Sequence, residues 1–171
     1  MKPAPFDYAA PETLDEALAL LQQHGEDARP LAGGQSLVPM LALRLARPTA
    51  LIDLNRIPEL AGIAVEDGRL RIGAMTRQAA LLASEEIARH APLMIQALQL
   101  VGHPPTRARG TIGGSLSHAD PAAELPAALL ALDADILMRG PAGTRSLPAG
   151  EFFHGPFETA VEPGEILTEV Q

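Results

Sequence analysis

The chain has 171 residues, of which 47% are apolar, 20% charged and 3% aromatic. This length accommodates one domain or two small ones, and the hydrophobicity excludes intrinsic disorder. The net charge is −8, and residues 111–171 carry nine acids against two bases, which disfavours a nucleic-acid-binding surface. No cysteine is present, which excludes disulfides, thiolate zinc sites and cysteine-ligated clusters in these residues. Because no apolar run is long enough to span a membrane or to form a signal peptide, we expect a cytoplasmic protein.

The first sixty residues predict two helices and two short strands. Apolar residues recur at helical spacing from Leu14 to Leu21, and Thr13 with Glu16 forms a capping box at the start of this helix. Gly25 is expected to end it. Further elements are expected as strands at residues 29–32 and 50–54 and as a helix at residues 37–45.

The rest of the chain alternates short strands with helices. A β-hairpin is expected from residues 63–65 and 70–74, followed by helices that begin near Thr76, Ser84 and Pro92. The later elements are a polar connection at 103–110, an apolar helix at 125–132, and strands at 135–138, 145–147 and 166–170. This interleaving places the chain in the α+β or α/β class.

Two glycine pairs share a local pattern. Residues 32–37 (Ala-Gly-Gly-Gln-Ser-Leu) and 111–116 (Thr-Ile-Gly-Gly-Ser-Leu) each follow a strand-like segment and precede a helix-like one. Glycine permits positive φ and close approach of the backbone to a ligand, and successive free N–H groups bind anions. Diphosphate is the ligand class that best suits such a pair. The alternative, that each pair only makes a tight turn, stays open on these residues alone.

Other common sites do not match. Neither glycine pair has the spacing of a Rossmann dinucleotide site or of a P-loop, and Val38 stands where a nucleophile elbow needs glycine. No set of catalytic or metal-ligating residues is found. His118 and Asp120 are expected to hold a loop or contact a ligand by hydrogen bonds, and Glu124 is either a helix cap or a carboxylate that accepts hydrogen bonds from a ligand.

Four stretches together resemble a known family. Residues 31–39 (Leu-Ala-Gly-Gly-Gln-Ser-Leu-Val-Pro), 51–54, 72–76 and 109–126 resemble, in the same order, the FAD-binding medium subunits of molybdenum hydroxylases. The similarity covers residues 5–171 and is greatest to carbon monoxide dehydrogenase medium subunits, with the xanthine dehydrogenase flavin domain more distant. It implies an α+β chain with the FAD-binding fold of the vanillyl-alcohol oxidase type. Two α/β subdomains, residues 1–56 and 57–171, would then bind FAD between them.

The resemblance also implies the residues that contact FAD. The diphosphate would be wrapped by Ala32, Gly33, Gly34, Gln35, Ser36, Leu37 and Val38. The second glycine pair and its neighbours would approach the diphosphate and the ribityl chain with Thr111, Gly113, Gly114 and Ser115. The flavin side of the pocket would be lined by Ser117, His118, Ala123 and Glu124, and bordered by Ala74 and Thr106.

The implied function is that of an electron-transfer subunit. FAD would pass electrons to an external acceptor from iron–sulfur clusters on a [2Fe-2S] small subunit, and a molybdopterin-binding large subunit would choose the substrate. Medium subunits of the family continue into a further C-terminal domain, whereas this chain stops at Gln171, so we expect a shortened chain, a split gene product or a degraded relative. The alternative is a non-catalytic scaffold that holds FAD weakly or not at all. A stand-alone flavin oxidase ranks last, because no residue set for a substrate site is found.

Overall fold

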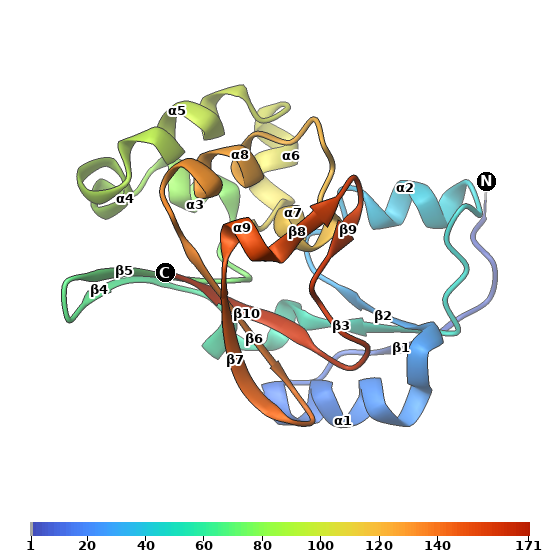
Figure 1. The fold of residues 1–171 in the computed structure, drawn as a ribbon. Helices are drawn as coiled ribbons and strands as arrows, with labels where there is room; N and C mark the ends of the chain where they lie inside the picture. The colour runs from blue at the N-terminus through green and yellow to red at the C-terminus, as the bar shows by residue number, and fades with distance from the viewer. Residues whose placement is uncertain (1) are drawn as a thin grey trace.

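The computed structural model describes residues 2–171, and its N-terminal part is built on a small parallel sheet. The strands are ordered β1-β3-β2 and comprise β1 (Asp7–Ala9), β2 (Ala28–Leu31) and β3 (Ala50–Asp53). Helices α1 (Leu14–His24) and α2 (Leu37–Ala42) lie on opposite sides of this sheet (Figure 1). We call this sheet with α1 and α2 the N-terminal lobe.

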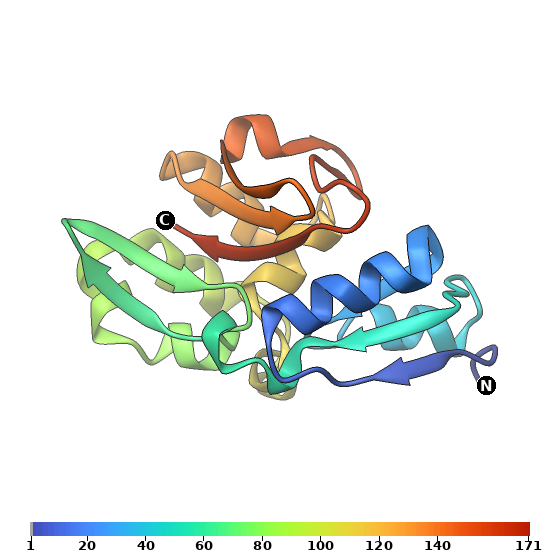
Figure 2. The same ribbon diagram turned by 90° about the horizontal axis from the view of Figure 1, so that it is seen from below.

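The remainder forms a larger C-terminal lobe around an antiparallel sheet of order β4-β5-β10-β6-β7. Its strands are β4 (Ile63–Glu66), β5 (Arg69–Gly73), β6 (Asp135–Gly140), β7 (Gly143–Pro148) and β10 (Ile166–Val170). On one side of the sheet lie α3 (Gln78–Leu82), α4 (Glu85–His90), α5 (Pro92–Leu100), α6 (Pro104–Arg109), α7 (Ile112–His118), α8 (Glu124–Ala131) and α9 (Ala149–Phe152), as Figures 1 and 2 show. The small hairpin of β8 (Phe153–Gly155) and β9 (Glu158–Thr159) follows α9.

Each lobe has its own hydrophobic core. Residues such as Leu14, Leu21 and Ile52 form the first core between α1 and the parallel sheet. The second core joins the antiparallel sheet to the helices above it. Met75 and Ile166 belong to the first core although they come from the C-terminal lobe, so they pack the two lobes together.

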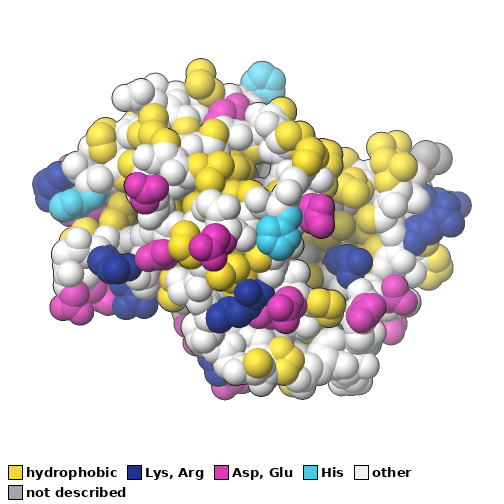
Figure 3. All heavy atoms as spheres, viewed as in Figure 1, with side chains coloured by type: hydrophobic (Ala, Val, Ile, Leu, Met, Phe, Trp, Pro, Cys, Tyr) yellow, Lys and Arg dark blue, Asp and Glu magenta, His cyan; other side chains and the backbone are white. Residues whose placement is uncertain are grey.

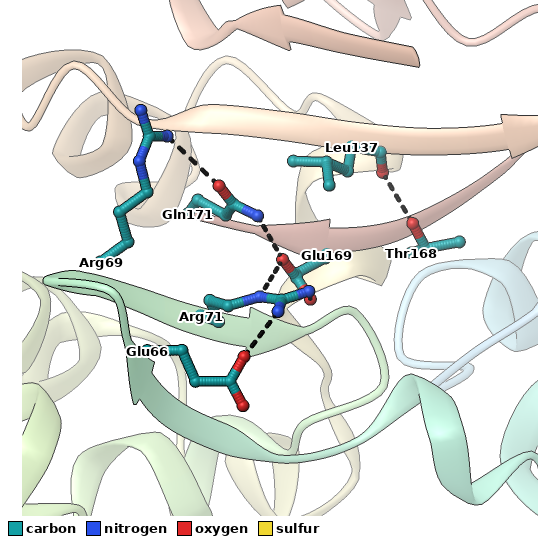
Figure 4. Close-up of polar contacts among 7 residues, drawn as sticks. All are labelled: Glu66, Arg69, Arg71, Leu137, Thr168, Glu169 and Gln171. Carbon is teal, nitrogen blue, oxygen red and sulfur yellow. Dashed lines mark hydrogen bonds and ion pairs between the residues drawn. The ribbon is translucent and has the colours of Figure 1, made fainter. Parts of the chain in front are cut away.

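Polar side chains tie β10 to its neighbours in the antiparallel sheet. Arg71 on β5 donates to both carboxylate oxygens of Glu169 at 2.8 Å and also pairs with Glu66 at 2.7 Å (Figure 4). Gln171 links Glu169 to Arg69. These contacts hold the last strand in register on a partly exposed surface of the sheet.

The predicted elements are largely confirmed, with corrections at α1, α6 and α2, while α7, α9 and the β8–β9 hairpin have no counterpart among the predicted elements. Thr13 is the N-cap of α1 as expected and accepts from the Glu16 N–H, but the Glu16 carboxylate accepts from the Glu12 N–H at 3.0 Å rather than from the Thr13 N–H, so only half of the capping box forms. The polar connection at 103–110 contains a helix, α6, because Pro104 occupies a first-turn position where a missing N–H costs nothing. Helix α2 ends earlier than residue 45, since Arg44 takes a positive φ of 58°. Among the helices of residues 2–171, none combines the length and apolar character that crossing a membrane requires.

Candidate FAD-binding cleft

A cleft of about 1290 Å³ lies between the two lobes. Figure 3 shows the hollow beside the lobe that carries α2. Its walls come from β2 and the loop to α2, from α7 and the loop to α8, and from residues 157–167. Pockets for small ligands usually measure roughly 300–1,000 Å³, so this cleft has room for a dinucleotide.

The structure brings sixteen of the seventeen predicted FAD-binding residues to this cleft. They are Ala32, Gly33, Gly34, Gln35, Ser36, Leu37, Ala74, Thr106, Thr111, Gly113, Gly114, Ser115, Ser117, His118, Ala123 and Glu124. The exception is Val38, whose 51% exposed side chain packs over Gly34 at the start of α2 instead of lining the cleft. The convergence of the other residues is a property of the fold, and their contact with FAD stays a prediction.

The first glycine segment, residues 32–37, presents a run of free backbone donors. Gly34 has a φ of +73°, the left-handed conformation that favours glycine. Within residues 2–171, the N–H groups of residues 33–37 donate to no backbone or side-chain acceptor, and the Ser36 hydroxyl makes no capping hydrogen bond. Adjacent free N–H groups of this kind bind anions. The sequence-based prediction of an anion-binding loop is therefore consistent with the geometry here.

The second glycine segment, residues 111–116, does not have this property. Gly113 and Gly114 lie inside the first turn of α7 rather than in a turn before it, and neither has a positive φ. The Gly113 N–H donates to the Ala74 carbonyl at 2.8 Å, and the Gly114 N–H donates to the Thr111 hydroxyl at 3.1 Å. The prediction that both pairs offer free amides is thus wrong for the second pair, because the helix cap and the packing on Ala74 use its donors.

Close packing explains the glycines of the second segment. A Cβ on Gly113 would lie 2.6 Å from the Cβ of Ala74. A Cβ on Gly114 would lie 2.9 Å from Thr111 Oγ1 and 3.3 Å from the Cβ of Ala32. Position 114 therefore faces the first glycine segment directly, and the two segments meet at the floor of the cleft.

Polar side chains line the end of the cleft formed by α7 and α8. The His118 and Phe157 rings pack with their centroids 5.2 Å apart. Asp120 Oδ1 accepts from the Ala122 N–H at 2.9 Å, which confirms that Asp120 holds the loop. Glu124 begins α8, but its carboxylate makes no hydrogen bond or ion pair with the described residues, and Ala123 supplies no side-chain cap. Residues 2–171 contain no cluster of three potential metal ligands.

Gln78 and Phe157 are among the cleft-lining residues that sequence reasoning missed. Gln78 is only 5% exposed, and its Oε1 is buried without a hydrogen-bond partner. Phe157 is 60% exposed, has a positive φ of 60° and donates its N–H to the Ala119 carbonyl at 2.8 Å. No local pattern identifies either residue, because the long-range folding of α3 and of the β8–β9 turn brings them to the cleft.

The residues present fit FAD. The free N–H groups of the first glycine segment match the anionic diphosphate, and the missing side chain at Gly114 lets the second segment pack directly against the first. Hydroxyls and an unpaired carboxylate suit a hydroxyl-rich ribityl chain, and they are provided by Ser115, Ser117 and Glu124. The cleft therefore carries both donors for the diphosphate and acceptors for the ribityl hydroxyls.

Comparison with known proteins gives a consistent result. Residues 4–171 match the family described as the FAD binding domain in molybdopterin dehydrogenase. The 6-hydroxypseudooxynicotine dehydrogenase complex subunit alpha of Paenarthrobacter nicotinovorans is 47% identical over 99% of this chain and 57% of its own length. The structure of carbon monoxide dehydrogenase from Hydrogenophaga pseudoflava superposes with a TM-score of 0.97 at 46% identity, over 99% of this chain and 59% of that one.

A more distant structure supports the fold alone. UDP-N-acetylenolpyruvylglucosamine reductase from Thermus caldophilus superposes with a TM-score of 0.61 at 20% identity. The predicted fold class and the predicted family are both confirmed, and the chain spans less than two thirds of the length of the relatives named above. This chain belongs to the family of FAD-binding domains of molybdopterin dehydrogenases.

Proposed function

We propose that this chain holds FAD in the cleft as the flavin-carrying part of a molybdenum-containing hydroxylase or dehydrogenase complex. The observation that carries the proposal is the row of free N–H groups at residues 33–37, which lies directly beside the side-chain-free position 114 in the lining of the cleft. Such a row binds a diphosphate, and FAD is the cofactor of the family.

The two lobes would share the cofactor. We assign the N-terminal subdomain to residues 1–56 and the C-terminal one to residues 57–171. The amides of residues 33–37 would donate to the diphosphate, while Ser115, Ser117 and Glu124 would contact the ribityl chain. His118 and Phe157 would border the flavin ring and exclude water from it. Bound FAD supplies the redox chemistry, and the protein supplies position and electrostatics.

The electron path would run from a partner subunit to an outside acceptor. We infer a [2Fe-2S] small subunit as electron donor and a molybdopterin-binding large subunit as the site of substrate hydroxylation. The family description supports this inference, and so do the names of the relatives, which describe a subunit of a dehydrogenase complex and a medium chain of a dehydrogenase. The absence of cysteine from these 171 residues is consistent with clusters held by another chain.

Titration with FAD tests the cofactor assignment. The purified chain should bind FAD with the visible absorbance of a flavoprotein, and its melting temperature should rise with FAD concentration. Riboflavin, which lacks the diphosphate, should bind far more weakly. If FAD neither binds nor raises the melting temperature, the scaffold alternative replaces the proposal.

Co-purification with the small and large subunits of a relative tests the proposed partners. Elution of this chain separately from those subunits would contradict them.

A further inference from the structure

A continuous chain of hydrogen bonds runs behind the cleft from the first glycine segment to Arg109, two residues before the second segment. Asn55 Nδ2 donates to the Ala32 carbonyl at 2.9 Å, and Asn55 Oδ1 accepts from Nη2 of Arg77. Nη1 of Arg77 donates to the Arg109 carbonyl. Two side chains therefore connect the carbonyl beside Gly33 to the carbonyl that precedes Gly110.

The chemistry of the neighbours fixes the orientation of the Asn55 amide. Its Nδ2 faces two acceptors, the Ala32 carbonyl and Asp53 Oδ1, while its Oδ1 faces a guanidinium, which only donates. Asp53 is held in turn by the Tyr8 hydroxyl at 2.5 Å and by the Asn55 N–H at 2.9 Å. A flipped amide would lose every one of its contacts, so Asn55 works in one orientation only.

Arg77 contributes two hydrogen-bond donors here rather than an ion pair. Its side chain forms no ion pair within residues 2–171 and instead spans an amide oxygen and a backbone carbonyl. Burial, together with the nearby positive charge of Arg109, lowers the pKa of Arg77. A cation in such surroundings is costly, and a planar guanidinium is the group that reaches two acceptors at fixed separation.

The ends of this link lie where the lobes touch. A Cβ on Gly33 would overlap the Arg109 carbonyl oxygen, which is also the acceptor for Arg77. Arg77 also forms a β-bridge with Thr111, which begins the second glycine segment. The link therefore acts on the contact that sets the distance between the two walls of the cleft.

We propose that Asn55 and Arg77 are positioning residues for FAD, which hold the first glycine segment at the correct distance from the second. This inference rests on the proposed function, because it assumes that FAD spans the two segments. Neither side chain touches the cofactor in this arrangement. Each acts through the backbone carbonyls of Ala32 and Arg109.

Two variants cut the link at different points. Asn55→Asp still accepts from Arg77 but replaces the Nδ2 donor with an oxygen that faces the Ala32 carbonyl. Arg77→Lys keeps the charge, but a single ammonium cannot reach both acceptors. The control is Arg71→Lys, which breaks another two-pronged guanidinium contact, an ion pair with Glu169 on the sheet and away from the cleft (Figure 4).

We expect Asn55→Asp and Arg77→Lys each to weaken FAD binding about tenfold or more, and the double variant to weaken it little further, because one link is cut twice. Arg71→Lys should bind FAD within about twofold of the parent chain. Affinity is measured well below the melting temperature, where a variant that lost only stability would still be folded and would bind normally. The visible circular dichroism of saturated FAD should also change in the two link variants and not in the control.

The outcomes separate the two proposals. If the parent chain binds no FAD, the proposed function fails. If the parent binds FAD and both folded link variants bind it equally well, the positioning role is wrong. Should Asn55→Asp fail to fold, Arg77→Lys decides the question alone, since it keeps the charge and the aliphatic stem.

Discussion

Gly33 lies directly against the main-chain carbonyl of Arg109. A Cβ at position 33 would overlap that oxygen and would lie 2.9 Å from Gly110 Cα. Backbone atoms cannot rotate away as a side chain can, and Gly33 is not among the residues with positive φ. The two glycines of the first segment therefore serve different purposes: Gly33 permits contact between the lobes, and Gly34 permits the turn.

We expect Gly33→Ala to lower the free energy of unfolding by about 1–3 kcal/mol and to weaken FAD binding, because the lobes must separate to admit a methyl group. Urea unfolding of the FAD-free chain and FAD titration measure the two effects. Gly150→Ala is the control, since a Cβ there meets no atom within 4 Å. It should leave stability unchanged or raise it slightly. A Gly33→Ala protein as stable as the parent would show that the contact is looser than the structure indicates.

Removing the hydroxyl of Ser36 and removing that of Thr111 should have different effects on stability and on FAD binding. Ser36 makes no capping bond, so Ser36→Ala should leave the stability of the FAD-free chain unchanged and weaken FAD binding severalfold. Thr111 is 1% exposed and caps α7, so Thr111→Val should cost about 1 kcal/mol of stability. Melting temperatures and FAD titrations of both variants test this contrast. A stability loss in Ser36→Ala would mean that its hydroxyl has a structural role.

Local patterns in the sequence were sufficient to predict most of the elements. The apolar spacing around Leu14 and Leu21 predicts α1 because that face is buried against the parallel sheet. The antiparallel hairpin at residues 63–73 follows from its turn residues. The family resemblance supplied the cleft residues, and the lobes bring sixteen of them together.

The sequence could not show which backbone N–H groups of the glycine pairs already donate hydrogen bonds within the fold. Gly33-Gly34 and Gly113-Gly114 look equivalent in the sequence, yet only the first pair keeps its N–H groups free. The difference depends on Ala74, which contacts the second pair only after β5 and α7 have packed together. For the same reason the Asn55–Arg77 link has no signature in the sequence, since its ends are backbone carbonyls.

Glu124 offers a carboxylate to the cleft with no partner in the described chain. If it accepts hydrogen bonds from FAD, Glu124→Ala should reduce FAD affinity about tenfold, as expected for loss of a hydrogen bond to a charged group. The fold should persist, with only a small loss from the helix start. Glu124→Gln is the matched control, because it keeps the shape and one acceptor oxygen and should retain part of the affinity. Unchanged FAD binding in Glu124→Ala would leave Glu124 as a residue of the helix terminus only.

The ion pair between Arg145 and Glu165 should make stability depend on acid pH. Arg145 donates from Nε and Nη2 to the two Glu165 oxygens at 2.7 Å, and this pairing holds the pKa of Glu165 below its ordinary value although burial opposes the shift. A lowered folded-state pKa contributes stability above the unfolded value of about 4.3, and that contribution is lost as pH falls through the folded value. In urea titrations of the FAD-free chain, the free energy of unfolding should therefore fall more steeply from about pH 5 to pH 3 than it does for Glu165→Gln, whose side chain cannot ionise. Other carboxylates titrate in both proteins, so the difference between the two curves isolates Glu165. Parallel curves would show that folding does not lower the pKa of Glu165.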